Sequence, residues 1–236
     1  MRPSAELSVV VLCYRAGEAV VALVERLREA LAETNAPFEL VLVANYDAGV
    51  PDTTPAVAHR LAASRPDIVV VAEVKQGGMG WDLRSGLEAA NGEAIAVIDG
   101  DGQYEPADVV RAFTVLRETG ADVAKGRRTS RSDGLVRKLV TLTYNAAFAL
   151  LFPRVGVRDV NGKPKAITRA ALQQLELRSD DWFLDAELVL EARRLRLRIV
   201  EFPVAYLSGS RPSFVKPAAV LEFARHMLRY RLTGRP

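Results

Sequence analysis

Short apolar runs alternate with amphipathic segments through the first half of the chain, and this alternation most restricts the fold. The predicted strands are the apolar runs 7–14, 38–44, 67–74 and 94–98. The predicted helices are the amphipathic segments 18–33, 54–64, 83–90 and 106–118. Such regular alternation predicts an α/β fold, with a mostly parallel, Rossmann-like sheet flanked by helices. Right-handed crossovers then bring the carboxyl ends of these strands to one common rim.

The second half, residues 121–236, is less regular. The elements expected there are a strand at 121–126, helical structure at 134–152, a turn at 159–165, helices at 169–176 and from about 184, a strand at 197–206 and a final helix at 217–232. No Pro/Gly/Ser-rich linker divides the 236 residues, so we expect a single domain. Its two halves are 1–120 and 121–236.

Composition is that of a soluble globular protein, with 49% hydrophobic and 26% charged residues. The one cysteine, Cys13, excludes an internal disulfide, and His59 and His226 give no Cys/His metal spacing. No apolar run reaches the roughly 18 residues that cross a bilayer, and the N-terminus does not resemble a signal peptide. We therefore expect a cytoplasmic protein, soluble or peripheral to the inner face of a membrane.

Basic residues concentrate in two segments. Residues 125–138 hold six Lys or Arg against Asp133, an excess of five, and residues 216–236 hold five against Glu222, an excess of four. Each cluster fits a solvated surface, or a surface that receives phosphates or anionic lipid. The apolar segment 134–152 likewise fits either a buried core helix or an interfacial helix lying on lipid.

The run AIAVI at 94–98 ends in two carboxylates, Asp99 and Asp101, separated by one glycine. Open α/β sheets bind ligands at the carboxyl ends of their strands. Two like charges this close repel each other unless water, a cation or a positively charged ligand compensates them. Hard oxygen ligands favour Mg²⁺ or Mn²⁺ that also contacts a phosphate. A solvated turn is the other interpretation of this segment.

A glycine-rich segment, KQGGMG at 75–80, lies between a predicted strand and a predicted helix. It is not a P-loop, because no Gly-Lys-Ser/Thr follows, and Leu83 stands where the dinucleotide fingerprint needs its third glycine. Two interpretations stay open: a loop whose backbone approaches a ligand, with Lys75 and Arg84 as phosphate partners, or a tight strand-to-helix turn.

The run KQGGMGWDLRSGLEAANGEAIAVIDGDGQ, residues 75–103, closely resembles the family 2 glycosyltransferases. Within that family it is most similar to the dolichyl-phosphate and polyprenyl-phosphate sugar transferases, whose acidic motif also continues to a glutamine. The resemblance implies a GT-A fold and a GDP- or UDP-sugar donor bound by residues 1–120. It also implies a lipid phosphate acceptor bound by residues 121–236, and a divalent cation, Mg²⁺ or Mn²⁺, held by Asp99, Asp101 and Gln103. No nucleic-acid partner is expected.

The resemblance places donor-binding residues after the first and second predicted strands and in the glycine-rich turn. The first strand departs from the family's pattern at Cys13, Arg15 and Ala16, and Glu18 stands near the missing carboxylate. In the second strand Asn45 replaces an acid that contacts the base, and Gln76 falls on the family's Asn. The residues implied in donor binding are Tyr14, Glu18, Asn45, Asp47, Gln76, Gly80, Asp82, Asp99 and Ser213.

In the second half the resemblance implies residues for the acceptor and for catalysis. Arg128, Arg131 and Arg137 fall where basic residues meet the acceptor phosphate, and the fork of arginine can hold two phosphate oxygens at once. The segment 159–163 replaces the family's Asp-x-x-Ser-Gly-Phe. The residues implied in catalysis are Asp101, Asp185, Glu187 and Arg211.

In the reaction that the resemblance implies, the acceptor attacks the sugar from the face opposite the departing nucleoside diphosphate, which predicts inversion at the anomeric carbon. A polyprenyl phosphate is already anionic and needs no strong base, whereas a hydroxyl acceptor would need Asp185 or Glu187 to take its proton. Three hypotheses follow: transfer of sugar to a polyprenyl phosphate, transfer to a soluble hydroxyl acceptor, and binding of a nucleotide sugar without turnover. The sugar, the base and the oligomeric state are not predicted.

Overall fold

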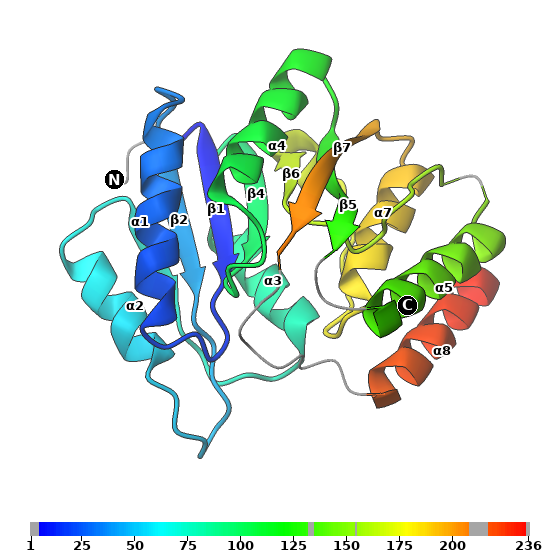
Figure 1. Ribbon diagram of the computed structural model, residues 1–236, viewed down its shortest axis with the longest axis horizontal. Helices are drawn as coiled ribbons and strands as arrows, with labels where there is room; N and C mark the ends of the chain where they lie inside the picture. The colour runs from blue at the N-terminus through cyan, green and yellow to red at the C-terminus, as the bar shows by residue number, and fades with distance from the viewer. Residues whose placement is uncertain (1–4, 132–134, 154, 208–216, 235–236) are drawn as a thin grey trace.

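The structure, a computed structural model, describes residues 5–131, 135–153, 155–207 and 217–234. Its described strands form one sheet of seven, in the order β3-β2-β1-β4-β6-β5-β7 (Figure 1). The strands are β1 (Leu7–Leu12), β2 (Phe38–Val43), β3 (Ile68–Val71), β4 (Ala94–Asp99), β5 (Val123–Arg131), β6 (Lys165–Thr168) and β7 (Ile199–Tyr206). Of the described strands only β6 runs against its neighbours, so the predicted α/β class with a mostly parallel sheet is confirmed.

The four strands of the first half follow directly from their sequences. β1 (LSVVVL), β2 (FELVLV) and β4 (AIAVID) are buried along nearly their whole length. Apolar side chains on both faces of a strand need cover on both sides, which a parallel sheet between two layers of helices supplies. All four strands pair in parallel, so their carboxyl ends share one rim.

Helices cover both faces of this sheet (Figure 1). They are α1 (Ala19–Ala32), α2 (Thr54–Ala63), α3 (Met79–Ala89), α4 (Pro106–Thr119), α5 (Leu135–Leu151), α6 (Arg169–Leu172), α7 (Leu184–Arg194) and α8 (Pro217–Thr233). One core packs α1, α2 and α4 on the sheet, and another packs α3 and the first residue of α7 on the opposite face. A third core joins α5, α7 and α8. None of the helices within the described ranges combines the length and hydrophobicity that crossing a bilayer requires.

The second half differs from its prediction at three elements, and one of them is β5, which runs to Arg131, five residues beyond the predicted strand. The predicted turn at 159–165 leads into a strand, β6, that pairs antiparallel with β4 and β5 and was not predicted. Its first residue, Lys165, is buried, and a lysine next to turn-forming residues gives no strand pattern. The predicted helix at 169–176 ends at Leu172, after one turn that the hydroxyl of Thr168 caps at its start.

Candidate functional site

The acidic turn after β4 lies at the carboxyl rim, beside the end of β1. Asp99 is the last residue of β4 and pairs in register with Leu12. Gly100 donates its backbone N–H to the carbonyl of Leu12 at 2.9 Å, and a Cβ on Gly100 would lie 2.6 Å from the same oxygen. Only glycine fits so close an approach, so the path of the chain between Asp99 and Asp101 is fixed.

Gln103 connects the acidic turn to the end of β7. Its backbone N–H donates to Oδ1 of Asp101 at 3.0 Å. Its side-chain Oε1 accepts from the hydroxyl of Tyr206 at 2.7 Å, and its Nε2 donates to the carbonyl of Leu207 at 3.1 Å. Asp99, Asp101 and Gln103 therefore lie in one turn, and the amide of Gln103 is hydrogen-bonded within the protein.

Lys163, which the sequence placed only in a turn, lies against the first of these acids. Its Nζ is 2.6 Å from Oδ1 of Asp99 and 3.8 Å from Oδ2 of Asp185. The lysine side chain is 3% exposed, whereas that of Asp99 is 32% exposed. Burial lowers the pKa of Lys163, but the charges of Asp185, Asp99 and Asp101 outweigh burial and raise the pKa above its ordinary value. The ammonium is therefore charged at neutral pH.

Asp185, at the start of α7, is enclosed between two lysines. Nζ of Lys165 donates to its Oδ1, and Lys163 lies on its other oxygen. Its side chain is 5% exposed. Burial by itself would raise the pKa of Asp185, yet the two lysines hold that pKa below its ordinary value. Asp185 is consequently a fixed carboxylate in a charge cluster with Lys163 and Lys165.

Glu187, the other acid implied in catalysis, holds the segment before α7. Its two oxygens accept the backbone N–H groups of Arg178 and Ser179, at 3.0 and 2.8 Å. Burial raises the pKa of Glu187, although these hydrogen bonds to Ser179 and Arg178 oppose the shift. Glu187 thus contacts backbone rather than the acidic turn, and its predicted catalytic role stays a prediction.

The glycine-rich loop packs against the segment that Glu187 holds. Gly78 and Trp81 donate their backbone N–H groups to the carbonyl of Asp180, at 2.7 and 3.1 Å. A Cβ on Gly80 would lie 2.6 Å from the carbonyl oxygen of Ser179. The glycines therefore allow one part of the backbone to approach another, while Gln76, in the same loop, is exposed.

A buried polar cluster follows β2. Asn45 donates from Nδ2 to Oδ1 of Asp82 and to the hydroxyl of Ser85, each at 3.0 Å, and its Oδ1 accepts the backbone N–H of Glu73 at 2.9 Å. Lys75 forms an ion pair with Asp82. Burial raises the pKa of Asp82 and Lys75 opposes that shift. This cluster joins three residues implied in donor binding or its phosphate contacts, and it uses the amide of Asn45 internally.

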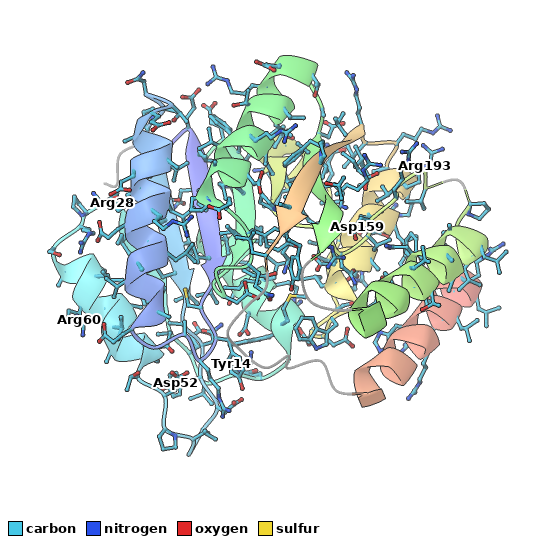
Figure 2. The ribbon with its side chains drawn as sticks, in the orientation of Figure 1. Tyr14, Arg28, Asp52, Arg60, Asp159 and Arg193 are labelled. Carbon is cyan, nitrogen blue, oxygen red and sulfur yellow. The ribbon has the colours of Figure 1, made fainter. Side chains whose placement is uncertain are left out.

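Tyr14 and Asp47 connect the ends of β1 and β2, with Tyr14 labelled in Figure 2. The hydroxyl of Tyr14 donates to Oδ2 of Asp47 at 2.6 Å, and Lys75 lies over the tyrosine ring, 4.4 Å from its centroid. Burial and the Asp47 carboxylate raise the pKa of Tyr14 to about 12. Glu18 instead pairs with Arg60 of α2 at 2.6 Å, and both side chains are more than half exposed.

Arg128 of β5 forms a two-pronged ion pair with Asp159. Its Nε and Nη2 donate to the two carboxylate oxygens at 2.8 and 2.7 Å, and its backbone N–H donates at 3.0 Å. Lys125 donates to the carbonyl of Asp159 and lies 3.6 Å from Glu201. Arg128 therefore holds the start of the segment that carries Lys163.

The remaining predicted residues lie outside what the structure describes. Arg211 and Ser213 are outside the described residues. Arg131 belongs to β5 and Arg137 to α5, but their side chains are outside the described part of the chain. Their predicted contacts with phosphates stay predictions.

The acidic turn has a donor set that suits a shared metal site. No group of three His, Cys, Asp or Glu residues able to hold a metal ion occurs within the described ranges. Mg²⁺, however, commonly binds through one or two carboxylates and completes its shell with substrate phosphates and water. Asp99 and Asp101 supply two such carboxylates in a turn of fixed path. They therefore fit a divalent ion that a diphosphate helps to hold.

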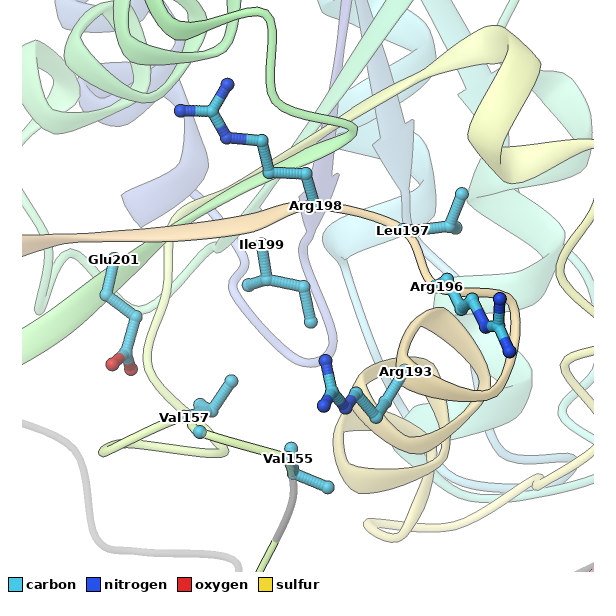
Figure 3. A pocket seen from close by; sticks show the side chains of 9 residues that line it. Val155, Val157, Arg193, Arg196, Leu197, Arg198, Ile199 and Glu201 are labelled. Carbon is cyan, nitrogen blue, oxygen red and sulfur yellow. The ribbon is translucent and has the colours of Figure 1, made fainter.

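A cavity of about 360 Å³ lies beside the start of β7 (Figure 3). Its lining includes Arg193, Arg196 and Arg198, together with Val157 and Ile199. Ile199 pairs with Val123, the first residue of β5, so this cavity is at the amino end of the strands. None of the predicted site residues that the structure describes is in its lining.

The model of glycosyl transferase family 2 matches residues 8–175, which include all of β1 except Leu7, β2 to β6, the acidic turn and the Lys163 segment. The chain belongs to this family. The predicted membership is therefore confirmed over most of the chain, and its first half carries the motifs on which the prediction rested.

Two curated relatives of this family 2 glycosyltransferase differ in length. Glycosyltransferase AglD of Haloferax volcanii is 30% identical over 205 residues, which cover 84% of this chain and 32% of AglD. Polyprenol monophosphomannose synthase of Mycolicibacterium smegmatis is 26% identical over 223 residues, covering 87% of this chain and 79% of the synthase. The chain thus spans about a third of AglD and most of the synthase.

A solved structure shares the fold. Glucosyl-3-phosphoglycerate synthase of Mycobacterium tuberculosis, in complex with Mn²⁺, UDP and glucosyl-3-phosphoglycerate, superposes with a TM-score of 0.71 at 19% identity. The match covers 98% of this chain and 81% of the synthase. The predicted GT-A fold is confirmed by this likeness, since it includes nearly the whole chain.

Proposed function

We propose that this chain transfers a sugar from a nucleoside-diphosphate sugar to a polyprenyl phosphate, with inversion at the anomeric carbon. One observation carries the proposal: Asp99 and Asp101 lie at the carboxyl rim, with the Tyr14–Asp47 pair on the neighbouring strands and the Lys163 cluster on the other side. Relatives named as polyprenyl-phosphate sugar transferases support the acceptor class.

In this proposal residues 1–120 bind the donor and residues 121–236 bind the acceptor. Tyr14, Asp47 and the Asn45–Asp82–Lys75 cluster form the wall along which the nucleotide lies. Asn45 keeps that wall in place through its internal hydrogen bonds, and the ammonium of Lys75, 3.5 Å from the carbonyl of Gly78, places a positive charge at the glycine-rich loop. Whether the base is uracil or guanine is a matter for a donor screen.

The reaction needs negative charge to be stabilised on the departing nucleoside diphosphate. Asp99 and Asp101 would hold Mg²⁺ or Mn²⁺, with Gln103 beside them, and such an ion supplies electrostatic stabilisation of the leaving group. Gln103 fixes the shape of the turn by joining it to Tyr206 and Leu207. Arg211 and Ser213, which the family resemblance brings to the donor phosphates, complete the proposed donor side.

The contacts of the two acids favour a phosphate over a hydroxyl as acceptor. Asp185 is held by Lys163 and Lys165, and its pKa lies below the ordinary range, so it is a weak base. Glu187 is occupied by two backbone N–H groups. A polyprenyl phosphate carries its own anionic nucleophile and requires neither acid to remove a proton. Arg128, Arg131 and Arg137 are the proposed partners of its phosphate.

Access to a lipid acceptor is supported by the outer surface of α5 and α8. These helices lie next to each other (Figure 1) and expose Leu142, Leu150, Leu228 and Leu232 to solvent by 65%, 81%, 54% and 85%. We propose that this surface lies on the cytoplasmic face of a membrane. Sedimentation with anionic vesicles should recover the wild-type chain, and Leu150→Asp with Leu232→Asp should release it.

The experiment that tests the proposed reaction supplies purified protein with UDP- and GDP-sugars, Mg²⁺ or Mn²⁺, and a polyprenyl phosphate. A sugar-linked polyprenyl phosphate of inverted configuration is the expected product. Product only with a hydroxyl acceptor, product of retained configuration, or donor binding without product would each contradict it. A thermal-shift screen of donors before the assay selects the sugar and the base.

A further inference from the structure

Lys163 places a buried positive charge beside the carboxylate that the proposed metal site uses. Its ammonium contacts Asp99 at 2.6 Å and lies 3.8 Å from Asp185. An ammonium on Oδ1 of Asp99 and a divalent cation compete for the same carboxylate charge. The reaction described above gives this lysine no role.

The backbone leaves the lysine little freedom. A Cβ on Gly162 would lie 2.0 Å from the carbonyl oxygen of Gly126, and a Cβ on Gly126 would lie 2.4 Å from the carbonyl oxygen of Lys163. The segment is therefore in direct backbone contact with β5. The backbone N–H of Lys163 also faces the hydroxyl of buried Tyr104, at 3.4 Å. The side chain is 3% exposed, and its ammonium lies between Asp99 and Asp185.

The charge balance at the rim depends on this lysine. Among the described residues, Lys163 is the lysine that forms an ion pair with Asp99, whereas Lys165 pairs with Asp185. Replacing Lys163 by a neutral residue would therefore remove this countercharge from the acidic turn itself. A diphosphate would then meet a strongly repulsive surface until a metal ion arrived.

We propose that Lys163 is a positioning residue that serves as a built-in cation of the rim: it shares Asp99 with the divalent ion and lets a diphosphate bind before any metal. The inference rests on the proposed function in that it takes the acidic turn as the diphosphate site. It adds a residue and an order of binding. The ammonium lowers the affinity of the empty protein for the metal and raises its affinity for the diphosphate.

These two effects have opposite signs, and that separates the proposal from a purely structural role. Loss of packing would weaken the binding of both ligands. Loss of a shared cation weakens the binding of the diphosphate and strengthens the binding of the metal, because Lys163 no longer competes with the ion for Asp99. The ammonium acts on the diphosphate through space, and the interaction of two unit charges a few ångströms apart near a protein surface corresponds to about a tenfold or larger change in affinity.

The test uses two probes that need no knowledge of the sugar or the base. Isothermal titration measures the binding of inorganic pyrophosphate in EDTA, and of Mn²⁺ alone, to wild type and to Lys163→Gln. We expect pyrophosphate to bind the variant about tenfold more weakly, and Mn²⁺ to bind it severalfold more tightly. Absence of metal-free pyrophosphate binding to wild type, or weakening of both probes in the variant, would overturn the proposal.

Lys165→Gln is the matched control. Lys165 is as deeply buried and contacts the same Asp185, but among the described residues it forms no hydrogen bond or ion pair with Asp99. We expect it to change each affinity less than threefold. Equal changes in the two variants would show an effect of net charge or packing and would refute the specific assignment to Lys163.

Asp99→Asn gives a second measurement if Lys163→Gln does not fold. Asp99 is partly exposed, and the asparagine that replaces it keeps the shape of the side chain. Here the expected signs reverse: Mn²⁺ binds more weakly, and pyrophosphate in EDTA binds more tightly because Lys163 has lost its competing anion. Weaker binding of both probes would contradict the proposal. Since no step measures turnover, failure of sugar transfer and failure of this inference are separate results.

Discussion

The two halves of the chain place their charges differently. In the first half, away from the rim, ion pairs lie on the surface: Arg60 and Glu18 are 60% and 67% exposed. In the second half the pairs next to the acidic turn are inside, with Lys165 and Asp185 only 1% and 5% exposed. Apolar strands therefore organise the first half, while the second half depends on buried ions whose partners are far apart in sequence.

This difference shows where the fold is tolerant and where it is not. Removing one member of an exposed pair leaves a charge that water solvates. Removing one member of a buried pair leaves an uncompensated charge in the interior, which is strongly destabilising. The ions of the second half also adjoin the acidic turn, so the same side chains affect both stability and binding.

The largest expected effect breaks the buried pair of Arg128 and Asp159. Asp159→Asn should lower the free energy of unfolding by about 3–5 kcal/mol, because the guanidinium stays buried without its countercharge. Denaturant unfolding followed by circular dichroism measures it. Glu18→Gln, which breaks an exposed pair, is the control and should leave the unfolding midpoint unchanged. Similar losses in both variants would remove the distinction between the halves.

Asp101→Asn tests the acidic turn, where the first half meets the buried ions of the second half. Loss of a charge-stabilising group should reduce kcat by about 10²–10³-fold with the unfolding midpoint nearly unchanged. Initial rates with the donor found by screening, at saturating Mn²⁺, measure it. Asp108→Asn in the first turn of α4 is the control carboxylate and should keep the wild-type rate. An unaffected rate in Asp101→Asn would refute the proposed metal-binding role.

A pH dependence is expected from the buried ions of the second half. Burial, together with the charge of Lys165, lowers the pKa of Lys125 from 10.5 to about 8. Between pH 8 and 10 the unfolded chain therefore holds a proton that the folded chain has released, and stability rises with pH by up to about 2 kcal/mol. Below pH 8 both states are protonated and this contribution is constant.

The comparison of wild type with Lys125→Met isolates this contribution. Urea unfolding of both proteins at intervals from pH 8 to 10 should show the wild type gaining stability relative to the variant. A difference that stays flat, or falls, would mean that Lys125 keeps its proton in the folded protein.

The smallest expected effect concerns Glu187. Glu187→Gln keeps the shape of the side chain but replaces one accepting oxygen with a donor, so one backbone N–H near Ser179 loses its partner. We expect a loss of about 1 kcal/mol in the free energy of unfolding. If the folded variant turned over a lipid phosphate acceptor far more slowly than the wild type, this small loss of stability could not explain the result. Glu187 would then be assigned as a catalytic base.

The fold of the first half could be predicted because its pattern is local. Each apolar run, such as AIAVI at 94–98, identifies a strand by itself, and parallel pairing then places Asp99 and Asp101 at the rim. The glycine-rich loop was correctly placed between a strand and a helix. The backbone of this loop approaches the segment 179–181. That segment lies about a hundred residues further along the chain, so no local pattern in the loop indicates the contact.

The second half could be predicted less well because charged residues are common in turns and on surfaces. Lys163 and Lys165 follow Asn161 and Gly162 and flank a proline, a composition typical of an exposed turn. Their burial depends on Asp99 and Asp185, which are 64 and 20 residues away. The available signal was the replacement of the family's apolar Phe by Lys163, a change that required a buried countercharge.

The order of the strands also has a consequence for how chains meet. The sheet ends in β3, which has four residues, and in β7, which carries the exposed Pro203 in its middle. A proline has no N–H to offer a further strand, and a short border gives few positions for pairing. Both borders therefore discourage another polypeptide from extending the sheet, which protects a chain rich in apolar strands against edge-to-edge aggregation.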